Sequence, residues 1–261
     1  METDSMGSRE VPHSAYYGIQ TLRAVENFPV SGLTSSPVLV RSYALLKLAC
    51  ARANRELGAV DERRATAIER AAREVADGSL ADQFVVDVFQ AGAGTSLHMN
   101  VNEVLANRAL EVLGLPKGHY DELSPNDHVN RGQSTNDTYP SATQVAVLLA
   151  LQGVRASTQA LAASLARKAE EFAGRPKAGR THLKDAMPVT LGAEFRAYAS
   201  ALDHVLEGLP AVETALAEIP LGGSAVGSGV NSVVGFRARA VAEYARLTGL
   251  PLRTARDPFE S

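Results

Sequence analysis

The sequence predicts an all-α protein in which an amino-terminal helical domain is followed by part of a long-helix bundle. From Asp137 to Phe172, mostly apolar residues recur in steps of three and four, which is the spacing of a bundle helix. In a later segment the same spacing joins apolar residues without a break, and they are Leu191, Phe195, Tyr198, Leu202, Val205, Leu209, Val212, Leu216 and Ile219. At about 1.5 Å per residue both helices would be about 40–55 Å long, which favours an extended bundle over one compact core.

Shorter helices are expected before and after these two. Residues 1–35 contain turn-forming residues and scattered aromatics without a sustained period, so we expect an extended arm there. Turn and capping residues then bound the remaining helices, which are expected over residues 37–57, 61–76 and 236–248 and, after the turn at Ala91–Asn100, up to residue 113. Pro210 should kink the second long helix without ending its pattern.

Segments rich in turn-forming residues separate these helices. The segment Leu115–Asn126 contains prolines and a glycine and is the expected boundary between an amino-terminal domain, residues 1–126, and the bundle, residues 127–261. A polar connector is expected over residues 179–188, and a glycine-rich turn over residues 221–231.

Composition excludes several classes of function. The chain is 45% hydrophobic and 21% charged, the profile of a soluble globular protein. A net charge of −3 and a pI near 6.1, without a basic run interleaved with aromatics, argue against binding to nucleic acid. The longest purely apolar run, Val145–Leu151, is far shorter than the roughly 20 residues of a membrane span. We therefore expect a cytoplasmic protein with no membrane partner.

Cys50 is the single cysteine of the chain. It excludes an intrachain disulfide and a cysteine metal cluster, and its apolar neighbours indicate a small buried hydrophobe.

A polar segment at the start of the first long helix has the features of an anion site. Ser134, Thr135 and Asn136 offer hydroxyl and amide groups, Asp137 is placed to cap the helix, and Pro140 suits a first helical turn. Free backbone N–H groups and the positive end of the helix dipole would lie beside these side chains and could hold a carboxylate or a phosphate. The same cluster is also typical of an ordinary capped helix.

Two further turns carry similar groups. The small-residue turn Ala91–Asn100 lets the backbone approach a ligand, and Thr95 and Ser96 offer donors. It lacks the Gly-Lys-Ser/Thr of a Walker phosphate loop and the strand–turn–helix setting of a dinucleotide fingerprint, so by itself it is also consistent with a simple loop. The polar connector carries Thr181 and His182.

Together, these clusters and the arm resemble the aspartase/fumarase superfamily. The resemblance covers nearly all of residues 8–261, and residues 16–32 of the arm are more similar to aspartate ammonia-lyases than to fumarases. The most specific parts match the family in order and spacing, and they are Gln90–Glu103, Pro125–Pro140, Gly179–Phe195 and Leu221–Asn231.

The resemblance implies a lyase that uses no cofactor and no metal. A base removes a proton from the carbon beside one carboxylate of aspartate, ammonia leaves from the neighbouring carbon, and fumarate is formed. The residues at the family's binding positions for this small dicarboxylate or amino-acid substrate are Thr95, Ser96, Ser134, Thr135, Asn136, Thr181 and His182. His182 would be a carboxylate partner or, if cationic, an electrostatic stabiliser, with helix capping as the alternative.

The chain departs from the family pattern at three places. Leu97-His98 stands where the family has a small hydroxyl residue followed by Asn, which removes polar groups near the site and adds an imidazole. Ser124 stands where the family commonly has His, at a turn that would bind a second anion. The family's mobile loop with paired serines, which carries the catalytic base, would lie beyond Ser261.

These departures keep other functions open, namely a class II fumarase acting on malate and fumarate, and a catalytically silent helical assembly module. The apolar stripe over residues 191–219 also predicts a homo-oligomer, because each buried side chain of this kind contributes roughly 1.5–3 kcal/mol. The only comparably long partner is the helix over residues 137–172, so two helices would have to cover surfaces that a bundle of four or more normally buries. The family's tetramer is the first candidate.

Overall fold

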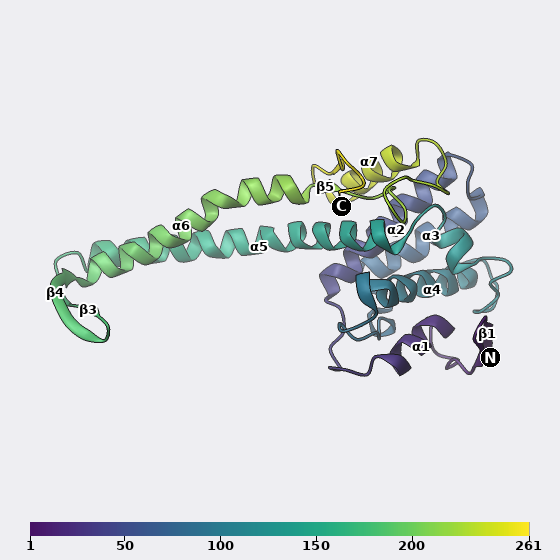
Figure 1. Cartoon of the computed structure of the whole chain (residues 1–261), viewed down its shortest axis with the longest axis horizontal. Helices are drawn as coiled ribbons and strands as arrows, with labels where there is room; N and C mark the ends of the chain where they lie inside the picture. The colour runs from purple at the N-terminus through teal and green to yellow at the C-terminus, as the bar shows by residue number, and fades with distance from the viewer. Residues whose placement is uncertain (261) are drawn as a thin grey trace. The chain divides into compact units, whose positions relative to one another are not determined.

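The computed structural model describes residues 1–260 and confirms an all-α fold (Figure 1). Its α-helices are α1 (Ile19–Asn27), α2 (Pro37–Glu56), α3 (Glu62–Ala76), α4 (Thr95–Val112), α5 (Thr135–Glu171), α6 (Leu191–Leu216) and α7 (Phe236–Thr248). Short strands pair as β1 (Glu2–Asp4) with β2 (Gly7–Arg9), β3 (Pro176–Thr181) with β4 (Lys184–Thr190), and β5 (Glu218–Ile219) with β6 (Arg253–Thr254). Helical turns cover Ala81–Gln83, Gly92–Gly94 and Pro125–Val129.

Contacts within the chain divide it into two compact units. The first unit holds residues 1–147 and the residues from 217 onward, and the second holds residues 148–216. Helix α5 therefore begins in the first unit and continues in the second. This division follows contacts within one chain, and a domain boundary at residue 126 stays a prediction for the assembled protein.

The core of the first unit is built on α2. This helix packs against α3 and α7, and α4 packs against α3 (Figure 1). Tyr43, Leu46 and Cys50 of α2 are fully buried, and the expectation that Cys50 is a buried hydrophobe is confirmed. Burial raises the pKa of the Cys50 thiol to about 12, so this cysteine is an unreactive core residue.

Capping side chains set the bounds of α2 and α3. Ser36 Oγ accepts a hydrogen bond from the backbone N–H of Leu39 at 3.3 Å, and Asp61 Oδ1 accepts one from Arg64 at 3.0 Å. The helices expected over residues 37–57, 61–76 and 236–248 are confirmed, with ends that differ by a residue at most. The helix expected after the turn at Ala91–Asn100 is also present, but it begins at Thr95, inside that segment.

The expectation of an extended arm over residues 1–35 is wrong, because this segment contains the β1–β2 hairpin and helix α1. The backbone N–H groups of Gly18, Gln20 and Thr21 at the start of α1 donate to the carboxylate of Glu103 in α4, at 2.9–3.0 Å. Glu103 is 1% exposed, and burial raises the pKa of its carboxyl. A helix start that is capped by a residue far along the chain leaves no local sequence signal.

In the second unit, the connector expected over residues 179–188 belongs to a β-hairpin. Strands β3 and β4 are antiparallel, with Thr181 opposite Lys184 and the turn His182-Leu183 between them. The φ angles of these two turn residues are +47° and +62°, as a type I′ hairpin turn requires. The two strands are largely exposed, so they lack the alternating apolar face that would have identified them in the sequence.

Helix α6 ends earlier than the apolar pattern predicts. Ile219, expected as the last residue of its seam, is fully buried in β5, which pairs parallel with β6. The apolar spacing in the sequence extends to Ile219 because a buried strand requires an apolar residue there, just as a helix seam would. Pro210 lies inside α6 without ending it, as expected.

Within the second unit, α5 and α6 approach closely near the hairpin. The ring centroids of Phe172 and Phe195 are 5.5 Å apart. A Cβ atom at Gly192 would lie 2.4 Å from the carbonyl oxygen of Ala169, so this crossing requires a glycine.

Apolar side chains on the same two helices remain exposed. Val205 and Tyr198 of α6 are 61% and 56% exposed, and Val154 and Leu161 of α5 are 54% and 52% exposed. By length and composition alone, α5 is apolar enough to cross a membrane, a test that core helices of soluble bundles also pass. Part of the predicted seam of α6 therefore remains uncovered within a single chain.

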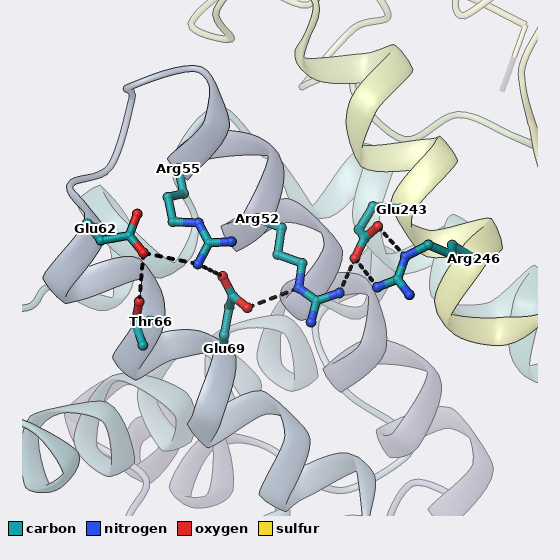
Figure 2. A network of polar contacts seen from close by, with 7 residues as sticks. All are labelled: Arg52, Arg55, Glu62, Thr66, Glu69, Glu243 and Arg246. Atoms are coloured by element: carbon teal, nitrogen blue, oxygen red, sulfur yellow. Dashed lines mark hydrogen bonds and ion pairs between the residues drawn. The ribbon is translucent and has the colours of Figure 1, made fainter.

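Ion pairs join α7 to α2 and α3. Arg52 of α2 donates to Glu69 of α3 at 3.0 Å and also to Glu243 of α7 (Figure 2). Arg246 pairs with Glu243 as well, at 2.7 Å. Hydrogen bonds from Arg246 and Arg52 lower the pKa of Glu243 to about 2. The side chain of Arg52 is 14% exposed, whereas that of Arg246 is 62% exposed.

We predict that Arg52→Leu lowers the free energy of unfolding at pH 7 by roughly 2–3 kcal/mol, because two largely buried carboxylates lose a partner. This loss of stability is smaller than the cost of leaving a buried charge without any partner, because Arg55 and Arg246 still contact these carboxylates. Arg246→Leu is the matched control and should cost less than about 1 kcal/mol, because exposed ion pairs contribute little. Urea unfolding followed by circular dichroism measures both.

The same contacts predict a dependence of stability on pH. The pKa of Glu243 is about 2 in the folded protein against an ordinary value of 4.5, so its stabilisation is present above pH 4.5 and is lost as the pH falls towards 2. This loss should be smaller in Arg52→Leu. Equal unfolding free energies for the two variants at pH 7 would contradict the account.

Candidate functional site

Asp137 ties the start of α5 to the glycine-rich loop over residues 221–231. Its carboxylate accepts hydrogen bonds from the backbone N–H groups of Ser134 at 2.9 Å, Gly222 at 2.9 Å and Ser224 at 3.0 Å. Asp137 is 1% exposed, and burial raises the pKa of its carboxyl, which these N–H donors partly oppose. One buried carboxylate thus holds together two segments that are far apart in the sequence.

The expectation that Asp137 is the cap of α5 is corrected by this geometry. The helix begins at Thr135, so Ser134 occupies the cap position, and its Oγ accepts from the N–H of Asn136 at 3.3 Å. Asp137 reaches back to the N–H of Ser134, which is the reciprocal arrangement of a capping box. Ser134, Thr135, Asn136 and Asp137 can each cap a helix, so the sequence alone does not show which of them does.

The glycine-rich loop packs directly on this helix start. Asn136 Nδ2 donates to the carbonyl oxygen of Ala225 at 2.7 Å. Gly222 has a φ of +88°, and a Cβ atom there would lie 2.6 Å from Cβ of Arg237, so only glycine fits. The loop and the helix start line a cavity of about 860 Å³, whose polar walls include Asn130, Arg131, Gln133, Ser134, Ser228 and Asn231.

His98 lies beside the predicted binding residue Thr135. Its Nδ1 is 2.6 Å from Thr135 Oγ1, and its Nε2 is 2.8 Å from Asn130 Oδ1. Burial, with a smaller contribution from Lys47, moves the pKa of this imidazole well below its ordinary value, so the ring is neutral at pH 7. Leu97 is fully buried in the core. The Leu97-His98 departure therefore places an uncharged imidazole against the hydroxyl and amide groups at the start of α5.

Lys47 is a residue of this site that sequence reasoning missed. It lies in the middle of α2 with no exposed surface, and its Nζ is 2.9 Å from Asn130 Oδ1, 2.9 Å from Gln133 Oε1 and 3.0 Å from His98 Nε2. Burial lowers the pKa of its ammonium to about 7. The available signal was a single lysine between Leu46 and Leu48 on a helix that is otherwise apolar there.

The turn that leads into α4 lies against α5. Gly94 has a φ of +76°, and a Cβ atom there would lie 2.1 Å from the Tyr139 ring, so the two helix starts meet at a glycine. Thr95 is exposed at the first position of α4, and Ser96 is buried behind it. The structure thus brings the Thr95-Ser96 cluster and the cluster at the start of α5 onto neighbouring helix starts.

Thr181 and His182 belong to the second unit. They are exposed at the end of β3 and in the hairpin turn, respectively, and not at the end of a helix. All of β4 separates the turn from α6, so the alternative of His182 as a capping residue of that helix is wrong. Their proximity to the first unit's clusters stays a prediction.

The groups gathered in the first unit suit an anion. Hydroxyls, amides and the unpaired N–H groups of a long helix can all donate to carboxylate oxygens. Across residues 1–260, no three side chains of His, Cys, Asp or Glu are grouped as metal ligands would be. Fold and site together define a long-helix protein in which hydroxyl and amide groups are gathered at the start of α5, the kind of groups that suit a small anion.

Comparisons with known proteins identify the class. The sequence pattern of a lyase family matches residues 7–261. The chain is 46% identical over 255 residues to an aspartate ammonia-lyase from a Bacillus species, covering 98% of this chain and 54% of that enzyme. It is 49% identical over 261 residues to a class II fumarate hydratase from Halobacterium salinarum, covering 100% of this chain and 55% of that enzyme. The chain belongs to the aspartase/fumarase superfamily of lyases.

Solved structures agree with this assignment. A fumarate lyase:delta crystallin from Brucella melitensis matches with a TM-score of 0.94 and 46% identity, over 99% of this chain and 57% of that one. A class II fumarase from Schistosoma mansoni matches with a TM-score of 0.89 and 33% identity, over 99% of this chain and 58% of that one. The chain therefore spans about half the length of the relatives it matches.

Proposed function

We propose that this chain is the carboxylate-binding, amino-terminal part of an enzyme that eliminates ammonia from L-aspartate to give fumarate without a cofactor. The observation that carries the proposal is the start of α5, where Ser134, Thr135 and Asn136 stand at the positive end of a long helix and Ser134 lines a polar cavity. The aspartate ammonia-lyases among its relatives support aspartate as the substrate.

The chemistry explains why donors are needed. Removing the proton beside a carboxylate places a second negative charge on that group, and donors fixed in advance stabilise this developing charge more than the ground state. Thr95, Ser96, Ser134, Thr135 and Asn136 would hold the substrate. Thr181 and His182 would complete the substrate-binding site, with His182 stabilising negative charge when it is cationic.

The catalytic base is assigned to the family's mobile loop, outside these 261 residues. A general base must lie within hydrogen-bond reach of the proton it removes, so the chain alone should bind without turnover. In this proposal residues 1–126 and 127–261 are an amino-terminal domain and part of the central bundle of a longer cytoplasmic enzyme.

A class II fumarase is the second candidate. The observation that favours it is the similar identity of the chain to relatives of both names, 46% and 49%. His98, of the Leu97-His98 departure, contacts Thr135, and this is where the proposed site would have to tell the two substrates apart. A catalytically silent assembly module is the remaining alternative. It would keep the fold and the anion-binding residues but would not turn over substrate.

We predict that the 261-residue chain forms no fumarate from aspartate or from malate above the level of Thr181→Ala, and that it binds fumarate weakly. Calorimetric titration should show this affinity falling roughly tenfold in Ser134→Ala or His182→Ala, since each removes one hydrogen bond to a charged group. Ser157→Ala on α5 and His204→Ala on α6 are the matched controls, because both side chains are exposed outside the proposed grips.

Unchanged binding in both variants would mean that Ser134 is only a helix cap and that His182 does not hold the substrate. Turnover of aspartate by the chain alone would contradict the placement of the base. Turnover of malate but not of aspartate by the longer enzyme would select the fumarase.

The exposed apolar faces of α5 and α6 support a homo-oligomer. Val205, Tyr198 and Val154 are each more than half exposed, at 61%, 56% and 54%, on helices that would form the centre of a bundle. A tetramer is the proposed assembly, in which copies of the same helix pair cover one another.

We predict that Val205→Asp with Val212→Asp dissociates this assembly, as measured by light scattering at micromolar concentration. Both side chains are largely exposed in one chain, at 61% and 48%, so the charges would be tolerated in a monomer but not in a dry interface. Val234→Asp, at a side chain that is 97% exposed in the first unit, is the matched control. A stable monomer of the unmodified chain would contradict the assembly.

A further inference from the structure

The buried cluster around Lys47 has a definite donor and acceptor count. A lysine ammonium has three N–H donors and no acceptor. Its three neighbours are Asn130 Oδ1 at 2.9 Å, Gln133 Oε1 at 2.9 Å and His98 Nε2 at 3.0 Å. The cluster is closed to solvent at its centre, since Lys47 is 0% and His98 is 2% exposed. Each donor therefore needs one of these three partners.

The two amides are oriented independently of Lys47. Asn130 Nδ2 donates to the carbonyl oxygen of Gln133 at 3.3 Å, and Gln133 Nε2 donates to that of Val129 at 3.1 Å. Both amide oxygens are consequently turned towards the ammonium and act as acceptors. The third ammonium proton is left for His98 Nε2, which can accept it only when that nitrogen carries no proton.

A neutral imidazole without a proton on Nε2 carries it on Nδ1, which is 2.6 Å from Thr135 Oγ1. We propose that His98, oriented by Lys47, donates its Nδ1 proton to Thr135 Oγ1 and so leaves the Thr135 hydroxyl proton free to donate to a substrate carboxylate. His98 and Lys47 are then positioning residues that set the direction of the Thr135 hydroxyl. This inference rests on the proposed function of Thr135 as a carboxylate grip.

The opposite tautomer has the opposite effect on the ligand. With its proton on Nε2, His98 donates to Asn130 Oδ1 at 2.8 Å, and Nδ1 accepts the Thr135 proton. Thr135 then presents only lone pairs to an anion, which repels a carboxylate. One Lys47 N–H would also remain buried without an acceptor. A charged Lys47 therefore selects the tautomer that binds anions.

This link makes anion binding depend on the charge of Lys47. The titratable groups that face its ammonium are Tyr43 and Cys50 of α2, His98 of α4 and Asp137 of α5. Burial raises the pKa of the tyrosine and of the thiol and lowers that of the imidazole, so those three groups stay neutral near pH 7. Burial lowers the pKa of Lys47 to about 7. Fumarate affinity should fall as the pH rises through that value.

The tautomer can be measured without any ligand. Nitrogen-15 NMR of the imidazole rings, in the full chain labelled at histidine, reports which ring nitrogen carries the proton, and His98→Asn identifies the His98 signals. We expect the proton on Nδ1 at pH 6 and on Nε2 at pH 8. In Lys47→Met the proton should be on Nε2 at both pH values, because the ammonium that fixed it is absent.

Fumarate binding supplies the functional measurement. At pH 6, calorimetric affinity should fall roughly 10- to 100-fold in Lys47→Met, the loss of one hydrogen bond to a charged group. It should also no longer vary between pH 6 and pH 8. His119→Asn, at an exposed histidine of the first unit, is the matched control for His98→Asn and should bind as the unmodified chain does. Thermal unfolding shows whether each variant is folded.

If Lys47→Met does not fold, the unmodified chain still tests the proposal. In that chain the His98 tautomer and the fumarate affinity must change together as the pH is varied. A proton on Nε2 at pH 6, or a folded Lys47→Met with unchanged fumarate affinity, would overturn the positioning role alone. Absence of fumarate binding by the unmodified chain at either pH would instead overturn the proposed function, and the inference with it.

Discussion

The carboxylate of Asp137 is the contact on which the candidate site depends. It is buried between the first turn of α5 and the loop over residues 221–231, and three backbone N–H groups offset the cost of burying its charge. Without it, the hydroxyls of Ser134 and Thr135 would stand at an ordinary helix end. With it, the loop forms the second wall of a polar cavity. The loop leads into α7, which Arg52 and Glu243 join to α2.

Buried acids bind backbone N–H groups at two other places in the first unit. Glu103 of α4 accepts the first N–H groups of α1, and Asp87 accepts those of Ser31 at 2.6 Å and Gly32 at 2.8 Å. In each case a segment with no apolar period of its own is fixed by a side chain from elsewhere in the fold. The helices supply the core, and these carboxylates attach the irregular segments to it.

Sequence patterns predicted what local physics determines. Capping residues such as Ser36 and Asp61 gave correct helices, and Cys50 is buried as its apolar neighbours indicated. Long-range contacts left no such signal. The start of α1 depends on Glu103, and the exposed β3–β4 hairpin has no apolar face. Within the site, the hydroxyl cluster was visible in the sequence, but Lys47 was hidden in the apolar run of a core helix.

Hydrogen exchange at the amides of Gly222 and Ser224, with and without fumarate, tests most directly whether the Asp137 carboxylate builds the site. In Asp137→Asn the side-chain amide turns a donor towards backbone donors, so both amides should exchange faster and fumarate should no longer protect the loop. Asp121→Asn, at an exposed residue outside the cavity wall, is the matched control and should leave exchange unchanged. Equal exchange rates and equal fumarate protection in Asp137→Asn and the unmodified chain would contradict the account.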